Sequence, residues 1–154
     1  MTSANERQVG GTHYQSTNQH WDVMYDYFGP SYGIGNATKY VTRARKKNGL
    51  QDLQKAAHYI QKTIEWAKAN FGHWQHTHFM AYERSAQFCI ANKLTIEEQR
   101  VLELLWGQWS IGDLHEALGL VEGMINALEA KAMLAKTTDG MKHPFGYKEE
   151  EEQK

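Results

Sequence analysis

The chain has little that would cross-link or interrupt it, with one cysteine and two prolines in 154 residues. Cys89 alone cannot form a disulfide within the chain, and its apolar neighbours Phe88 and Ile90 are typical of a buried thiol. Pro30 and Pro144 lie where we expect the chain to break. Long helices can therefore form between them without interruption.

Long apolar runs and an excess of charge are also missing. No stretch approaches the roughly 18 apolar residues of a membrane-spanning helix, and the N-terminus lacks a signal sequence. We therefore expect no membrane contact and a location in the cytoplasm where the protein is made. The formal net charge of -1 excludes a general polyanion binder, so any affinity for phosphate requires a local patch.

The apolar residues recur at helical spacing and predict a mainly α protein. The stop at Asn48 and Gly49, between helices expected at 33–47 and 50–70, predicts an N-terminal helical hairpin. Further helices are expected at 21–28 and 78–92. We divide the chain into a disordered N-terminus (1–8), a helical domain (9–71), a connector with a helix (72–94), a C-terminal module (95–147) and an acidic tail (148–154).

The C-terminal module reads as helix, short helix, glycine turn, helix and hairpin. Thr95 and Glu98 match a capping box before the first helix, and Gly119 is the expected turn. Residues 134–147 are expected to pair as a small β-hairpin around Asp139 and Gly140. This order resembles a winged helix-turn-helix. Its recognition helix would offer only Asn126 and Lys131 to DNA, which favours oligomerisation or partner binding over DNA binding.

The helix expected at 33–47 has a basic face. Between residues 39 and 47 there are five basic side chains and no acidic one. The polar residues that share one side are Asn36, Lys39, Tyr40, Arg43, Lys46 and Lys47. Gly33 and Gly35 would let a ligand approach the backbone at the helix start. These features suit a phosphate, with a base stacked on Tyr40 or Tyr14, although a solvated basic surface is the competing interpretation.

Two further segments could contribute to the same site. The loop Gly10, Gly11, Thr12, His13 and Tyr14 could close main-chain N–H groups around an anion, although it is not a P-loop. The helix at 50–70 offers Asp52, Lys55, His58, Tyr59 and Lys62. Asp52 could stabilise the helix start, pair with Lys55 or orient Arg43. We expect no metal site, because His73, His76 and His78 lack a completing cysteine or carboxylate.

Four segments together resemble a known family: VGGTHY at 9–14, WDV at 21–23, GNATKYVTRARKKNG at 35–49 and DLQKAAHY at 52–59. They are similar to a widespread family of small phage proteins described as nucleotide kinases after an early protein of a T-odd coliphage. The resemblance covers about residues 9–66. It implies phosphorylation of deoxynucleoside monophosphates without a P-loop, in a multi-subunit assembly in the infected host cytoplasm. The residues it points to are Gly11, His13, Tyr14, Asn36, Lys39, Tyr40, Arg43, Lys47, Asp52, Lys55 and Tyr59.

Three functional hypotheses follow. The first is a nucleoside monophosphate kinase in which Lys39, Arg43 and Lys47 bind phosphates, Lys55 neutralises developing charge and His13 positions or protonates the transferred group. No cofactor is certain, and Mg²⁺ is not evidently required. The second is a non-catalytic binding protein that sequesters a host nucleotide defence signal, favoured by the absence of a clear general base. Under either hypothesis we expect a homo-oligomer. The third is a DNA-bound regulator that uses residues 95–147.

Overall fold

The computed structural model describes residues 4–6, 9, 19–70 and 82–140. Within these ranges the protein is mainly helical, which confirms the predicted fold class. The helices are α1 (His20–Phe28), α2 (Pro30–Arg43), α3 (Leu50–Ala69), α4 (Tyr82–Asn92), α5 (Ile96–Trp106) and α6 (Ile111–Gly140), with a short 3₁₀ turn η1 (Ala44–Lys46) after α2. None of the described helices combines the length and apolarity needed to cross a membrane.

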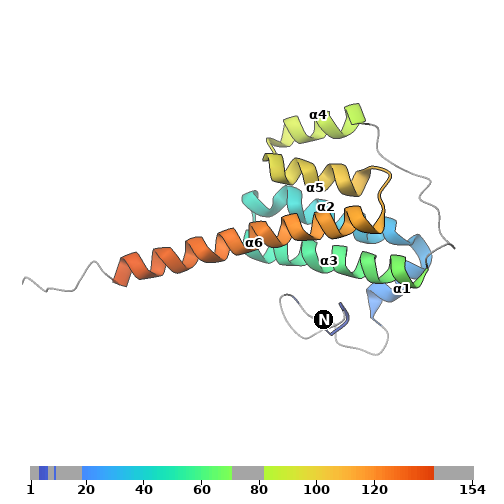
Figure 1. The fold of residues 1–154 in the computed structure, drawn as a ribbon, viewed down its shortest axis with the longest axis horizontal. Coiled ribbons are helices and arrows are strands. Elements are labelled where there is room, and N and C mark those ends of the chain that lie inside the picture. The colour runs from blue at the N-terminus through green and yellow to red at the C-terminus, as the bar shows by residue number, and fades with distance from the viewer. Residues whose placement is uncertain (1–3, 7–8, 10–18, 71–81, 141–154) are drawn as a thin grey trace, which may run out of the picture.

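Four helices form the body of the molecule. α3 packs against α2 and α6, and α5 packs against the same two helices from the other side (Figure 1). One hydrophobic cluster joins them, with fully buried Val41, Ile60, Leu102 and Leu114 contributed by α2, α3, α5 and α6 in turn. The helices before and after the predicted connector therefore share one core.

Glycines set the breaks between the first three helices. Gly29 ends α1 with a φ of 56°, and Pro30 then occupies the first position of α2, where its missing N–H costs nothing. Gly49 has a φ of 48° at the start of α3, a conformation that strongly favours glycine. The predicted stop at Asn48 and Gly49 is thus confirmed, although α2 itself ends at Arg43 and the chain continues as η1.

The predicted capping of α5 is also confirmed. Thr95 Oγ1 accepts a hydrogen bond from the Glu98 N–H at 3.2 Å, and Glu98 Oε2 accepts one from the Thr95 N–H at 2.8 Å. α5 ends at Trp106, as expected from Gly107. Ser110 then caps α6 by accepting a hydrogen bond from the Asp113 N–H at 3.2 Å.

The winged-helix layout is wrong in two respects. α6 continues through Gly119 without a turn, and it covers 134–140, where the first strand and the turn of the hairpin were expected. The reason is the buried stripe of Leu114, Ala117 and Val121, which keeps helical spacing across Gly119. Packing of this stripe outweighs the ~1 kcal/mol that a helical glycine costs. The rest of the expected hairpin, 141–147, lies outside the described residues.

The last part of α6 leaves the body. Figure 1 shows this segment projecting past the ends of the other helices. Its side chains at residues 131–137 are exposed, with Met133 exposed by 69%. The projecting part therefore contributes little to the core that holds the N-terminal helices in place.

Residues 4–6 are ordered within the N-terminal segment that was expected to be loose. Ala4, Asn5 and Glu6 form a turn, and Ala4 is fully buried against α3. At the other side of the gap, α4 begins at Tyr82, whereas the expected helix began at residue 78, which lies outside the described residues together with the histidines at 73 and 76.

Candidate functional site

Three positively charged side chains surround the ring of Tyr40. Lys39 Nζ lies 4.5 Å from the ring centroid, Arg43 Cζ 4.6 Å and Lys55 Nζ 5.7 Å. Lys39 and Arg43 belong to α2. Lys55 belongs to the first turns of α3, and α3 packs against α2. We call Lys39, Tyr40, Arg43 and Lys55 the Tyr40 cluster. Each cation is within the distance at which an aromatic face attracts positive charge.

Tyr40 is itself held by a second tyrosine. Its ring stacks on Tyr59 of α3 with centroids 5.9 Å apart and an interplanar angle of 16°. Tyr59 is further contacted edge-on by Tyr32 at 5.9 Å and by Trp21 at 6.0 Å. Burial, with nearby tyrosines, raises the pKa of Tyr59, so its hydroxyl stays protonated. This aromatic group fixes the platform on which the cations lie.

A buried carboxylate fixes Arg43. Arg43 Nε and Nη2 donate to Asp52 Oδ2 and Oδ1, both at 2.9 Å, and Asp52 is 0% exposed. Burial alone would raise the pKa of Asp52, but the paired guanidinium and hydrogen bonds from Asn48 hold it below its usual value. The carboxylate is therefore ionised near neutral pH. Of the roles the sequence left open for Asp52, the structure shows two: Asp52 lies in the first turn of α3, where it suits the helix start, and it orients Arg43.

Lys39 is held by the residue one turn before it. Its Nζ donates to Asn36 Oδ1 at 2.7 Å, and Asn36 Nδ2 donates to the Tyr32 carbonyl at 2.9 Å. Burial lowers the pKa of Lys39, and the charges of Arg43 and Lys55 lower it further. These cations therefore repel one another, and an anion placed among them would relieve the repulsion.

The remaining basic residues after α2 lie elsewhere. Arg45 donates to both carboxylate oxygens of Glu98 on α5 and to the Lys93 carbonyl, so it joins α2 to the C-terminal helices. Lys46 Nζ donates to Asn92 Oδ1 at 3.3 Å, and Lys47 is exposed in the following turn. The change from α-helix to 3₁₀ turn after Arg43 alters the spacing on which the expected stripe depended.

The glycines before the cluster have different environments. A Cβ added at Gly33 would lie 1.9 Å from Tyr25 Oη and 2.2 Å from Thr63 Oγ1, so Gly33 is needed for packing. A Cβ added at Gly35 would meet no atom of the described residues within 4 Å. The expected loop, Gly10, Gly11, Thr12, His13 and Tyr14, lies outside the described residues.

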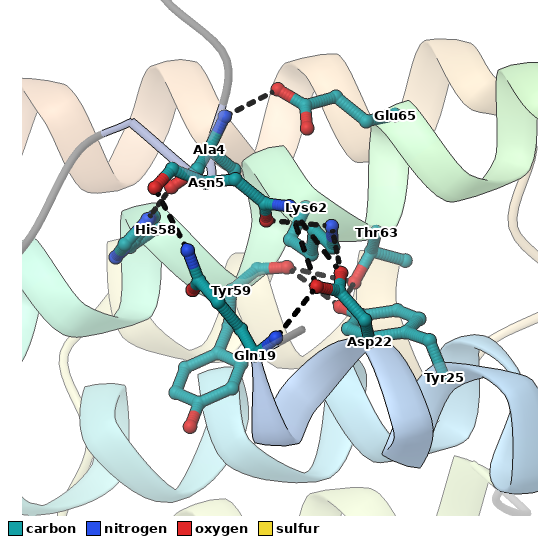
Figure 2. Close-up of polar contacts among 10 residues, drawn as sticks. All are labelled: Ala4, Asn5, Gln19, Asp22, Tyr25, His58, Tyr59, Lys62, Thr63 and Glu65. Carbon is teal, nitrogen blue, oxygen red and sulfur yellow. Dashed lines mark hydrogen bonds and ion pairs between the residues drawn. The ribbon is translucent and has the colours of Figure 1, made fainter. Parts of the chain in front are cut away.

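A second polar cluster attaches the N-terminus and α1 to α3 (Figure 2). Lys62 Nζ donates to Asp22 Oδ1 at 2.6 Å and to Asn5 Oδ1 at 2.8 Å. The Ala4 N–H donates to Glu65 Oε1 at 2.8 Å, and the Ala4 carbonyl lies 2.5 Å from His58 Nε2. Two of the polar candidates on α3, His58 and Lys62, therefore have structural contacts.

Sequence reasoning did not single out Tyr32. It lies one turn before Asn36 on α2, and its edge-on contact with Tyr59 joins it to the aromatic platform. The signal was present, because residues 32, 36 and 39 follow the same spacing of four and three as the basic face.

Comparison with known proteins places part of the chain in a described family model. Residues 10–61 match a family described as a protein of unknown function, DUF3310. No curated protein and no solved structure matches the chain. The matched segment ends within α3, so it includes the whole Tyr40 cluster. Among the described residues, no group of three or more histidine, cysteine, aspartate or glutamate side chains is placed to hold a metal ion.

Proposed function

We propose that the Tyr40 cluster binds a phosphorylated nucleotide. The observation that carries the proposal is the gathering of Lys39, Arg43 and Lys55 around one ring, with Asp52 as the carboxylate paired to Arg43. Three positive charges facing one negative charge leave an excess that a phosphate group would balance. A basic surface that is only solvated would not require its cations to converge on one partly buried aromatic ring, that of Tyr40.

The geometry of Arg43 suits a phosphate oxygen. Its bonds to Asp52 use Nε and Nη2, so Nη1 can donate to a ligand from a guanidinium that is already oriented. Tyr40 is already contacted by the Tyr59 ring and by the cations. We therefore propose that the role of Tyr40 is to position the cations. This replaces the base-stacking role expected for Tyr40.

We further propose the activity that the family resemblance implies, phosphorylation of a deoxynucleoside monophosphate. Transfer of a phosphoryl group depends mostly on positioning and on neutralising charge, which Lys39, Arg43 and Lys55 can supply. Sequestration of a nucleotide without chemistry would use the same cluster, and turnover distinguishes the two. The DNA-binding alternative was based on a winged-helix layout, and the continuous helix α6 does not have that layout.

The binding proposal is tested by calorimetric titration with nucleoside 5′-monophosphates. We expect Lys39→Gln and Lys55→Gln each to weaken binding by about 10-fold or more, because a charge-assisted contact contributes roughly 1.5–3 kcal/mol. Lys131→Gln, an exposed lysine on the projecting part of α6, is the matched control and should bind like the wild type. Failure of the wild type to bind any nucleotide would contradict the proposal.

The activity is tested on the same protein. The wild type is incubated with a deoxynucleoside monophosphate and a nucleoside triphosphate, and the small molecules are separated by ion-exchange chromatography. Newly formed deoxynucleoside diphosphate, lost in Lys39→Gln but kept in Lys131→Gln, supports the kinase. Stoichiometric binding with unchanged nucleotides would instead favour sequestration.

A further inference from the structure

Gly35 is a helical glycine for which the described part of the chain offers no packing reason. It lies in the middle of α2 and is exposed, and no described residue occupies the space where a side chain would be. Glycine disfavours a helix interior, because it loses more backbone freedom on folding than any other residue. By contrast, Gly33 is required by Tyr25 and Thr63, and Gly49 by its positive φ.

The position of Gly35 relates it to the Tyr40 cluster. Gly35 lies four residues before Lys39 on α2, so the two share one side of the helix on consecutive turns. Tyr32 lies three residues before Gly35 and precedes it on that side. The missing side chain thus leaves bare backbone between a tyrosine and the first cation of the cluster.

The hydrogen bonds around Lys39 direct it toward this stretch. Lys39 Nζ bonds to Asn36, the residue next to Gly35, and Asn36 bonds in turn to the Tyr32 carbonyl. The ammonium group is therefore drawn back along α2 toward residues 32–36. A phosphate bound by Lys39 would therefore leave Gly35 within reach of the rest of its molecule.

From this juxtaposition we propose that Gly35 forms the nucleoside subsite. The base and sugar of the ligand lie against the bare α2 backbone at Gly35, between Tyr32 and Lys39. The phosphate contacts the cations of the Tyr40 cluster. This inference rests on the proposed nucleotide binding and adds the part of the ligand that the cations do not explain. A phosphate ester with a planar ring fits the stretch, and a side chain at position 35 would occupy the same space.

The test uses two glycine substitutions that affect the fold in the same way. Gly35→Ala and Gly123→Ala each replace an exposed helical glycine that has open space around it, the second on α6. Both should raise the melting temperature. Calorimetry then compares each variant with the wild type, using nucleoside 5′-monophosphates and inorganic pyrophosphate as probes.

We expect Gly35→Ala to weaken nucleotide binding by about 10-fold, and Gly35→Leu by more, while pyrophosphate binds as it does to the wild type. Gly123→Ala should leave both affinities unchanged. Wild-type nucleotide affinity in Gly35→Ala and Gly35→Leu would overturn the subsite but leave the phosphate site standing, provided that Lys39→Gln still weakens binding. A wild type that binds no nucleotide would overturn both proposals.

Discussion

Arg43 and Asp52 show how a single residue pair supports the candidate site. The carboxylate of Asp52 is buried, and the guanidinium of Arg43 is its bidentate partner while remaining partly exposed, with 32% of its side chain accessible. Asp52 thereby fixes a cation that can still meet a ligand. The pair stabilises the fold only while both members are present, because a buried carboxylate without its partner is costly.

Removing Arg43 should therefore destabilise the protein as well as the site. We expect Arg43→Ala to lower the free energy of unfolding by about 3 kcal/mol, since it leaves Asp52 buried and unpaired. The double variant Arg43→Ala, Asp52→Asn should recover part of this loss. Urea denaturation followed by circular dichroism measures both, and an Arg43→Ala protein as stable as the wild type would contradict the assigned role.

The same pair predicts a dependence on pH. The pKa of Asp52 is lower in the folded protein than in the unfolded chain, so the unfolded chain binds more protons as the pH falls. The stability contributed by the pair is present above the unfolded value of about 3.9 and is lost as the pH falls through the folded pKa. The stability difference between the wild type and Asp52→Asn should shrink below about pH 4. Parallel denaturation profiles from pH 3 to 7 would show that Asp52 carries no such linkage.

At the scale of elements, α1, α2 and α3 meet at a close approach at Gly33. Tyr25 of α1 reaches across α2, where its hydroxyl lies 2.7 Å from Thr63 Oγ1 and donates to the Tyr59 carbonyl at 3.2 Å. Tyr25 is almost fully buried. Because Tyr59 also stacks on Tyr40, this packing connects the three-helix contact to the cation cluster.

Adding one methyl group at this contact should separate the helices. We expect Gly33→Ala to lower the free energy of unfolding by about 1–3 kcal/mol, the usual cost of overpacking. Gly35→Ala on the same helix is the matched control and should not destabilise the protein. In a Tyr25→Phe background the hydroxyl is absent, so the effect of Gly33→Ala should be smaller. Equal melting temperatures for Gly33→Ala and Gly35→Ala would exclude a tight contact at Gly33.

At the scale of the whole molecule, the α2–α3 pair that carries the site is completed by α5 and α6. The core cluster includes side chains of all four helices, and Arg45 of η1, just after α2, adds a bridge to Glu98 of α5. Two helices alone would leave one face of their apolar stripes exposed to water. We therefore infer that the described helical body unfolds as one cooperative unit.

This inference predicts a long-range effect of a substitution in α5. Leu102 is fully buried, and Leu102→Ala should lower the free energy of unfolding by about 2–5 kcal/mol. Hydrogen exchange should speed up for amides of α3 as well as of α5. Leu128→Ala, on the projecting part of α6, is the control and should change stability by about 0.5 kcal/mol or less. Unchanged protection of α3 in Leu102→Ala would show that the N-terminal helices fold independently.

The sequence by itself determined the helices and their boundaries wherever the signal was local. Capping by Thr95 and Glu98, the stop at Gly49 and the apolar stripe of α3 depend on residues within a turn or two of each other, so spacing along the chain was enough. It also identified Lys39, Tyr40, Arg43 and Lys55 as candidates. Their shared function stays a prediction.

Only the tertiary structure decided which of these residues meet. It separated Gly33 from Gly35, assigned Asp52 to Arg43, and used Arg45 and Lys62 for contacts 53 and 57 residues away along the chain. It also made α6 continuous through Gly119. The physical reason is the same in each case. The free energy that selects one arrangement comes from burial and pairing against another helix, and local spacing along the sequence does not show which residues of that helix take part.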